Sequence, residues 1–452
     1  MGASADLRYE RLCARLFVQN TFAIKLGLER MQSALARLDH PDRAFEVVVV
    51  AGTNGKGTTG ALLSTLLRAR GHRVGFYTSP HLCDLRERFR VDGTPLPRAE
   101  VLDLAAATIA VFGGFGTLDV DDAALGREVA ARWGWPRPED IAAEERLTFF
   151  ELTTIMALEG FRRRGVDIAV LEVGLGGRLD AVNAVEPALT VITSIGLDHQ
   201  EYLGESLGEI AAEKAGTMRA GRPTVVAPQA AEAMASLEAV AASLGATLHH
   251  AATTLPVALP DWLQHGFEPN VATAWTALQL LHPEASPDTL AAVLSTFRWP
   301  GRRDLVTLGT GELAGLWLLD AAHNPHGAET LARWLQASPQ WAPAAGVFGA
   351  MRDKDIAGVA AHLVARVPRW WTTAPNTPRA ATPEALAEIV EAAGGIVTPA
   401  DSVRAALVEA RCFAGDAPVL VCGSIYLLGE VLTTLEAGDG FFALVVRDLS
   451  EP

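Results

Sequence analysis

The segment VVVVAGTNGKGTTGALL, residues 47–63, constrains the fold more than any other part of the chain. A β-branched run enters a glycine-rich turn, and the turn leads into leucine-containing sequence typical of a helix. In such a strand–turn–helix unit the glycines let backbone N–H groups point inward, and the helix N-terminus adds positive potential. The segment therefore predicts a loop that binds phosphate.

This loop differs from the common phosphate-binding pattern GxxxxGK[ST]. Val50 occupies the position of the first glycine, and Gly57 separates Lys56 from Thr58. An ordinary glycine-rich turn would explain the glycines, but it would not explain Lys56 and Thr58 together. We therefore expect Lys56 to contact the β- and γ-phosphates of a nucleotide and the Thr58 hydroxyl to bind Mg²⁺.

Short β-branched runs alternate with helical sequence along the rest of the chain. Strands are expected at 45–52, 73–79, 166–174, 188–194, 316–322, 346–351, 369–374 and 417–424. Helices are expected at 61–71, 149–165, 326–336, 383–395 and 402–411. Such alternation predicts mainly parallel sheets that are covered by helices on both faces.

Two interruptions divide this pattern. Residues 297–304, FRWPGRRD, have the character of a linker, and residues 113–147 are rich in Gly, Pro, Trp and acids, which is typical of a surface insertion. We expect an α/β protein with a large N-terminal P-loop-type parallel-sheet ATPase domain at 1–297. A smaller C-terminal Rossmann-like α/β domain is expected at 298–452.

The composition excludes several classes of protein. The chain has 452 residues with 38 Lys and Arg against 53 Asp and Glu, a net charge of −15, so we expect neither nucleic acid nor an anionic membrane as partner. Its four cysteines are scattered and indicate free thiols in a reducing compartment. The absence of a leader pattern and of an apolar run of about 18 residues favours a cytoplasmic protein.

Further segments carry a resemblance that covers most of the chain. GTNGKG followed by threonine resembles the ATP-dependent Mur ligase superfamily, and the other segments narrow the resemblance to the folylpolyglutamate synthase/dihydrofolate synthase family. They follow the family's order: KLGLERM (25–31), TSPHL (78–82), TFFE (148–151), LEVGLGGRLDAVN (171–183), TSIGLDHQEYLG (193–204), EKAG (213–216), WPGRRD (299–304), DAAHNPHG (320–327) and GSIYLLGE (423–430).

The resemblance implies two Mg²⁺ sites. Thr58, Ser79 and Glu172 would help to hold the first, and His199 and Lys214 the second. Since Mg²⁺ prefers oxygen ligands, the family's answer is a CO₂-derived carbamate on Lys214, which replaces an ammonium with an anionic group. Taken singly, Lys214 has the alternative of a solvated lysine paired with Glu213. His199 has the alternative of a capping or core histidine.

The resemblance also implies the residues that bind the substrates. For ATP these are Gly52, Thr53, Asn54, Gly55, Lys56, Gly57, Thr58, Asn270, Arg302, Asp320 and His323. For folate they are Thr148, Phe149, Phe150, Glu151, Leu179, Asp180 and Ala181. One of the two phenylalanines has the alternative of a core position. Where the family often has an acidic residue before LGLER, this chain has Lys25 and Leu26.

The implied function is ATP-dependent addition of L-glutamate to folates, and also to dihydropteroate, through an acyl phosphate. Lys56, Glu172, His199 and Lys214 would be the catalytic residues, and the substrates would be ATP, L-glutamate and a folate or dihydropteroate. We expect a monomer. Two alternatives stay open at this point: a Mur-type amino-acid ligase acting on a cell-wall precursor, and a nucleotide-dependent binding module without ligase activity.

Overall fold

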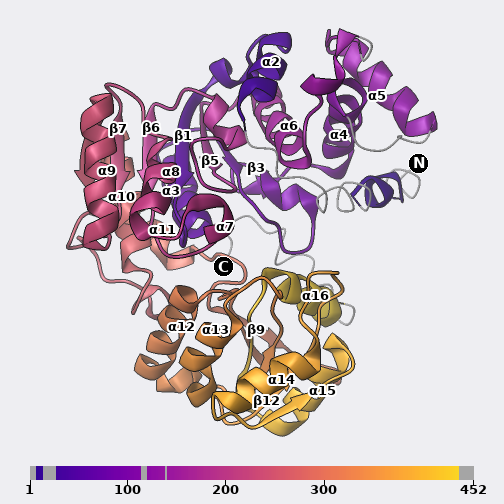
Figure 1. Cartoon of the computed structure of the whole chain (residues 1–452), viewed down its shortest axis with the longest axis vertical. Coiled ribbons are helices and arrows are strands. Elements are labelled where there is room, and N and C mark those ends of the chain that lie inside the picture. Colours follow the sequence, from indigo (N-terminus) through magenta and orange to yellow (C-terminus); the bar gives the residue numbers. More distant parts are fainter. Residues whose placement is uncertain (1–6, 14–26, 114–119, 138–139, 437–452) are drawn as a thin grey trace. The chain divides into compact units, whose positions relative to one another are not determined.

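The computed structural model describes residues 7–13, 27–113, 120–137 and 140–436, which form two compact units. Unit 1 comprises the described residues up to Ser79 together with Leu85–Leu255 and Pro269–Val293. Unit 2 comprises Pro80–Asp84, Pro256–Glu268 and the described residues from Leu294 onward. Each unit has its own sheet and its own core, and Figure 1 shows the chain in sequence colours.

Unit 1 is built on an eight-stranded sheet with the strand order β4–β3–β2–β5–β1–β6–β7–β8. The strands are β1 (Glu46–Ala51), β2 (Val74–Tyr77), β3 (Phe89–Val91), β4 (Thr94–Pro95), β5 (Ile168–Glu172), β6 (Leu189–Ile192), β7 (Pro223–Val226) and β8 (Thr247–His250). The pairs β2–β3 and β3–β4 are antiparallel and the other pairs are parallel. Because β1 is central and covered on both faces, it reads as a continuous valine run.

Helices cover both faces of this sheet. They are α2 (Glu29–Arg37), α3 (Lys56–Ala69), α4 (Arg98–Phe112), α5 (Val120–Arg132), α6 (Phe149–Arg163), α7 (Gln200–Leu203), α8 (Leu207–Ala215), α9 (Ala231–Leu244), α10 (Glu268–Leu281) and α11 (Pro287–Thr296). In Figure 1, α4, α5 and α6 lie together, and their buried side chains share one core with β1 and β5. Short 3₁₀ turns connect these elements at Pro41–Ala44, Leu85–Arg88, Ala143–Glu145 and Ala181–Ala184.

The interpretation of residues 113–147 as a surface insertion was wrong for much of its described part. Helix α5 packs against α4, and Val129 is fully buried in the unit 1 core. Trp135 is 8% exposed, and its ring lies 6.3 Å from that of Phe112. Part of the acidic sequence that suggested a loop, Asp121 and Asp122, belongs to α5, and the tryptophans after that helix add apolar surface to the core.

Unit 2 is built on a six-stranded sheet with the strand order β13–β12–β11–β14–β10–β9. The strands are β9 (Asp304–Leu308), β10 (Gly315–Leu319), β11 (Ala345–Phe348), β12 (Trp370–Thr372), β13 (Val397–Pro399) and β14 (Val419–Cys422). The β9–β10 pair is antiparallel and the remaining pairs are parallel. Together the two sheets confirm the predicted two-domain α/β fold.

The helices of unit 2 form two layers. They are α12 (Pro325–Ala337), α13 (Ile356–Leu363), α14 (Pro383–Ala392), α15 (Val403–Ala414) and α16 (Ile425–Glu436), with 3₁₀ turns at Asp261–Leu263, Pro339–Trp341 and Val364–Arg366. Successive strand residues point to opposite faces. Leu318 accordingly packs with α12, α13 and α14, whereas Trp317 and Leu319 pack with α15 and α16.

The segment 297–304, which the sequence suggests is a linker, is packed into unit 2. Phe297 is fully buried and stacks on Trp262 at 5.8 Å between ring centroids. Arg303 is 2% exposed, and its guanidinium donates to the carbonyls of Trp262 and His265 at 3.2 and 3.1 Å, and to that of Thr330. The second arginine of the motif is therefore a buried structural cation rather than a surface charge.

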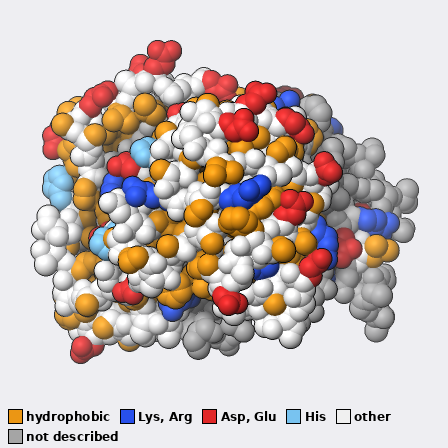
Figure 2. Space-filling model, turned by 90° about the horizontal axis from the view of Figure 1, so that it is seen from below, with side chains coloured by type: hydrophobic (Ala, Val, Ile, Leu, Met, Phe, Trp, Pro, Cys, Tyr) orange, Lys and Arg blue, Asp and Glu red, His pale blue; other side chains and the backbone are white. Residues whose placement is uncertain are grey.

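The surface and the helix lengths add two observations. On the face shown in Figure 2, basic and acidic side chains are interspersed among apolar ones. Among the described residues, no helix has the length and apolar character needed to cross a bilayer.

We predict that Arg303→Gln destabilises unit 2 by roughly 2–4 kcal/mol, because it leaves buried carbonyls without their donor. Denaturation in guanidinium chloride, followed by circular dichroism, measures the change. Arg302→Gln is the matched control: Arg302 is half-buried, its guanidinium donates to the carbonyl of Gly301, and a shift of about 0.5 kcal/mol or less is expected. Equal effects of the two substitutions would contradict a structural role that is specific to Arg303.

Candidate functional site

The predicted phosphate loop joins the end of β1 to the start of α3. Gly52 and Gly55 adopt positive φ angles of 147° and 86°, and the helix begins at Lys56, earlier than the predicted 61. The N–H groups of Thr53 and Asn54 donate to the carbonyl of Ser194 at 2.9 and 3.1 Å, which fixes the loop against the end of β6. The first amides of a helix have no acceptor within the helix itself, so the start of α3 is a suitable place for an anion to bind.

Lys56 and Thr58 both lie in the first turn of α3. Lys56 Nζ donates to the carbonyls of Gly52 at 3.0 Å and Thr53 at 3.2 Å. Thr58 is 1% exposed, and its Oγ1 has no hydrogen-bond partner among the described residues. A buried hydroxyl without a partner costs about 1–3 kcal/mol. This orphaned oxygen therefore fits a hard cation such as Mg²⁺.

Glu172 ends β5 beside this loop. The strand order β5–β1–β6 places the carboxyl ends of three parallel strands next to one another, and Val50 pairs with Glu172. Glu172 is 4% exposed, and its Oε2 accepts hydrogen bonds from Thr78 Oγ1 and from the N–H of Ser79. The strand that ends at Glu172, β5, and the strand that precedes His199, β6, are not neighbours in the sheet, because β1 lies between them.

His199 lies at the other side of β1, after β6. It adopts a left-handed conformation with φ 51° at the start of α7, and its N–H donates to Asp198 Oδ1 at 2.9 Å. Its side chain is 39% exposed and makes no capping hydrogen bond. The alternatives of a core histidine and of a side-chain cap are therefore both excluded.

Lys214 lies in the last turn of α8 and is only 3% exposed. Burial, followed by the positive charge of Lys56, lowers its pKa to about 7, while Asp198 and Asp180 partly offset the shift. The Glu213 carboxylate is paired with Arg178 at 2.8 Å. The alternative of a solvated Lys214 paired with Glu213 is therefore wrong.

Asp180 is the buried carboxylate of this region. It is 6% exposed and accepts hydrogen bonds from the N–H groups of Gly174, Leu175 and Val182 at 3.1, 2.9 and 2.9 Å. Burial raises its pKa to about 6 against the opposing effects of these hydrogen bonds and of Lys56. Next to it, Leu179 is half-buried and Ala181 is buried.

The TFFE segment opens α6, and its residues have different environments. Thr148 and Glu151 form a capping box, and Glu151 also makes an ion pair with Arg30 at 2.8 Å. Phe149 is buried in the core, as one of the two phenylalanines was expected to be. Phe150 is half-buried and lies 5.9 Å from the Tyr77 ring.

The remaining predicted residues divide between the units. Asn270 in unit 1 is 7% exposed and lies so close to Gly55 that a Cβ at this glycine would meet the Asn270 amide. In unit 2, the buried Asp320 accepts from the N–H groups of Arg303 and Ala322 at 3.0 and 2.9 Å. Burial raises the pKa of Asp320, whereas Arg302 and Arg303 oppose the rise.

Two histidines of unit 2 and two residues near the N-terminus were also singled out in the sequence. His323 lies near this aspartate in the chain, and its Nδ1 is 2.8 Å from the Ala321 carbonyl oxygen. His326 lies in the first turn of α12, as expected, and burial lowers its pKa. Lys25 and Leu26, where the chain departs from the family pattern, fall outside the described residues.

Several polar residues that contact or influence the site residues were not predicted from the sequence. Thr78 donates to Glu172, Asp198 lies close enough to Lys214 to affect its pKa, and Asn183 and Arg219 bridge the loops below Lys214. Thr78, Asp198 and Asn183 all occur inside segments that carry the family resemblance. Among the described residues, no group of three His, Cys, Asp or Glu side chains could hold a metal ion by itself.

We predict that Gly55→Ala weakens ADP binding by at least about tenfold, because the positive φ angle and the contact with Asn270 leave no room for a methyl group. Isothermal titration calorimetry measures this change. Gly196→Ala is the matched control on a neighbouring loop, where the nearest atom to an added Cβ is 3.7 Å away. Unchanged ADP affinity in Gly55→Ala would contradict this part of the phosphate loop.

Comparisons with known proteins find similar sequences over most of the chain. Residues 302–425 match the family model of the Mur ligase, glutamate ligase domain. The chain is 34% identical over 429 residues to the dihydrofolate synthase/folylpolyglutamate synthase of Escherichia coli (strain K12). The aligned region covers 92% of each protein.

Solved structures give the same result. E. coli FolC in complex with DHPP and ADP matches with a TM-score of 0.76 at 33% identity, covering 94% of this chain and 98% of that one. A bifunctional folylpolyglutamate synthase/dihydrofolate synthase with Mn, AMPPNP and L-glutamate bound matches with a TM-score of 0.76 at 32% identity, with the same coverage. The chain described here belongs to the folylpolyglutamate synthase/dihydrofolate synthase family.

Proposed function

We propose that this chain is an ATP-dependent ligase that joins L-glutamate to a folate and releases ADP and phosphate. The observation that carries the proposal is the orphaned Thr58 hydroxyl, which lies beside Lys56 in the phosphate loop at the carboxyl edge of β5, β1 and β6. The ligands of the relatives named above, a nucleotide, a divalent metal and L-glutamate, support it. The similarity to folate ligases extends over nearly the whole chain, which disfavours both a cell-wall ligase and a binding module.

The first step is phosphoryl transfer to the folate. An oxygen of its terminal carboxylate bonds to the γ-phosphorus, the bond to the β–γ bridging oxygen breaks, and ADP leaves. Lys56 Nζ would exchange its contacts with the Gly52 and Thr53 carbonyls for phosphate oxygens and so offset their charge. The first amides of α3 would hold the β-phosphate, since they have no acceptor in the helix.

The second step forms the amide. The glutamate amine attacks the acyl-phosphate carbonyl, the carbon–oxygen bond to phosphate breaks, and the amine loses a proton. Inorganic phosphate leaves with one of the original carboxylate oxygens. No enzyme nucleophile is required, because the carboxylate and the amine of the substrates attack in the two steps.

Residues from strand ends, loops and helix ends near the phosphate loop would hold the metal ions. Thr58, Ser79 and Glu172 would hold one Mg²⁺, and His199 and Lys214 a second. When bound, Mg²⁺ supplies positive charge that stabilises the transferring phosphoryl group. The orphaned Thr58 oxygen and the buried Glu172 carboxylate fit the first ion.

We further propose that Lys214 carries a carbamate. With a pKa of about 7, a large share of this amine is neutral at neutral pH, and only the neutral amine attacks CO₂. The new N–C bond forms, one N–H proton is lost, and an anion with two oxygens replaces the ammonium. Oxygen donors suit Mg²⁺, whereas an ammonium would repel it.

The other proposed roles follow the family pattern residue by residue. ATP would contact Gly52, Thr53, Asn54, Gly55, Gly57, Asn270, Arg302, Asp320 and His323 in addition to Lys56 and Thr58. The folate would contact Phe150, Leu179, Asp180 and Ala181 directly, while Thr148, Phe149 and Glu151 shape the wall. The environments of the last three support this division, because they are engaged in the helix cap and the core. A monomer with domains at 1–297 and 298–452 remains part of the proposal.

We predict that ADP release requires L-glutamate and a folate, and that both tetrahydrofolate and dihydropteroate serve as acceptors. A coupled assay at saturating ATP and glutamate measures both acceptors. Dihydropteroate binds only through its pterin and benzoate, so Phe150→Ala should weaken it by about tenfold, as expected for loss of an aromatic contact. Lys56→Ala should abolish turnover with either acceptor while its circular dichroism spectrum stays unchanged.

Two outcomes of this assay would contradict the proposal. ADP release that does not depend on any folate would refute the ligase assignment. Turnover with tetrahydrofolate alone would make the chain a folylpolyglutamate synthase only. The altered sequence at Lys25 and Leu26 would then be the first place to seek the reason.

We predict that Lys214→Ala is nearly inactive and that short carboxylates such as acetate or propionate partly restore its activity, because they can occupy the space of the carbamate. Initial rates across a carboxylate titration measure the rescue. Lys56→Ala is the control that should not be rescued, since its missing group is a cation. Full activity of Lys214→Ala without any added carboxylate would exclude the proposed role.

A further inference from the structure

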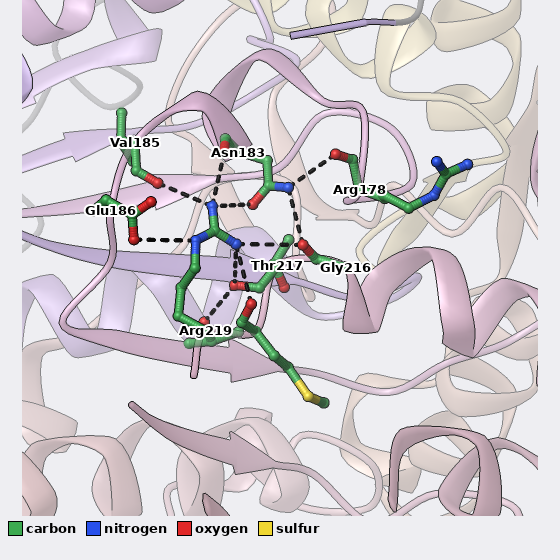
Figure 3. Close-up of polar contacts among 9 residues, drawn as sticks. Arg178, Asn183, Val185, Glu186, Gly216, Thr217 and Arg219 are labelled. Atoms are coloured by element: carbon green, nitrogen blue, oxygen red, sulfur yellow. Dashed lines mark hydrogen bonds and ion pairs between the residues drawn. The ribbon is translucent and has the colours of Figure 1, made fainter. Parts of the chain in front are cut away.

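Arg219 joins the loop that follows α8 to the loop around Asn183. Its Nη1 donates to the carbonyls of Gly216, Thr217 and Met218 at 3.4, 3.2 and 3.2 Å. Its Nη2 donates to the Asn183 carbonyl and Asn183 Oδ1, both at 2.9 Å, and to the Val185 carbonyl at 3.1 Å. Figure 3 shows the guanidinium lying between the two loops.

Asn183 completes the connection in the opposite direction. It is 5% exposed, and its Nδ2 donates to the carbonyls of Arg178 and Gly216 at 2.9 and 3.0 Å. The planar donor groups of Arg219 and Asn183 each bind carbonyls of both loops and so hold the two loops together. Glu186 also pairs with Arg219, but its side chain is 83% exposed, and exposed pairs contribute little.

We call the pair of Arg219 and Asn183 the latch. The latch connects the backbone of Lys214 to that of Asp180. The Lys214 carbonyl accepts from the N–H and Oγ1 of Thr217 at 3.1 and 2.8 Å. The Thr217 carbonyl in turn accepts from Arg219, and the N–H of Asn183 donates to the Asp180 carbonyl at 2.8 Å. A continuous hydrogen-bonded path therefore runs from the backbone of Lys214 to that of Asp180.

The two loops are also in close contact. A Cβ at Gly177 would lie 2.8 Å from the Glu213 carbonyl oxygen and 3.0 Å from Lys214 Cα. The loop that contains Asp180 therefore lies directly against the last turn of α8. A shift of α8 relative to this loop would change the distance between the Lys214 amine and its charged neighbours.

We propose that Arg219 and Asn183 are positioning residues, which fix the last turn of α8 so that the Lys214 side chain is aimed at the phosphate loop. This inference rests on the proposed ligase function, and it extends that function to two residues with no assigned role. Arg219 acts through the carbonyls of residues 216–218 and 183, since none of its partners named above belongs to the proposed substrate contacts. Residues that orient a metal-binding group typically change activity by roughly 10–100-fold when they are altered.

The test compares Arg219→Gln and Arg219→Lys with Arg222→Gln. Arg222 is an exposed cation three residues away and serves as the matched control. We expect kcat of Arg219→Gln to fall by roughly 10–100-fold with the KM for ATP unchanged, because the phosphate loop is separate from the latch. Arg219→Lys keeps the charge but not the planar fork and should lie in between. Arg222→Gln should equal the unaltered protein.

A second readout does not depend on turnover. After equilibration with ¹³C-bicarbonate, the ¹³C-NMR carbamate resonance that Lys214→Ala abolishes should be weakened in Arg219→Gln and normal in Arg222→Gln. If the unaltered protein has no ligase activity, the proposed function fails, and the resonance alone decides the positioning role. If the unaltered protein shows no carbamate resonance, the carbamate proposal fails. The positioning role of Arg219 is then tested by whether kcat falls while the KM for ATP stays unchanged.

Two results would overturn the inference. One is an Arg219→Gln protein with unaltered kcat and an unaltered carbamate resonance. The other is a loss of activity that only matches the fraction of unfolded protein, with a normal resonance in the folded fraction. If circular dichroism shows Arg219→Gln to be unfolded, Arg219→Lys and Asn183→Ala carry the same comparison.

Discussion

The main electrostatic constraint on the candidate site is the interaction between Lys56, which is half-buried, and Lys214, which is buried. Lys56 begins α3 and Lys214 lies in the last turn of α8, and the positive charge of Lys56 disfavours the charged form of Lys214. The pKa of Lys214 falls to about 7, whereas Asp180, also buried, has a pKa raised to about 6. A neutral Lys214 amine that gains a carbamate would replace repulsion with attraction to Lys56 and to metal ions.

Much of this arrangement could be predicted from the sequence, since it depends on local patterns. The valine run of β1, the glycines at positions 52 and 55 and the helix that follows fix the phosphate loop within a few residues. Glu172 comes directly at the end of a buried strand, so its place at the carboxyl edge of the sheet follows from strand geometry. The parallel sheets follow from the alternation of strands and helices.

The rest depends on contacts between residues far apart in the chain, which no local pattern encodes. Glu151 pairs with Arg30, and Arg303 binds carbonyls at positions 262 and 330, so two charged motif residues are structural. Strands β9 and β13 lie at the edges of their sheet, where each pairs with a single neighbour, and the sequence did not indicate them. In the sequence, nothing distinguishes Arg219 from a surface arginine. Its role depends on the carbonyls of Asn183 and Val185, which only the fold brings next to it.

The fate of one oxygen atom distinguishes an acyl-phosphate mechanism from simple hydrolysis of ATP. If the folate carboxylate attacks ATP and glutamate then displaces phosphate, one carboxylate oxygen must leave with the phosphate. A folate labelled with ¹⁸O in its terminal carboxylate, incubated with ATP and L-glutamate, should therefore give inorganic phosphate that carries one ¹⁸O atom by mass spectrometry. Unlabelled phosphate with continued ADP release would mean that water, rather than the folate, receives the phosphoryl group, and would contradict the mechanism.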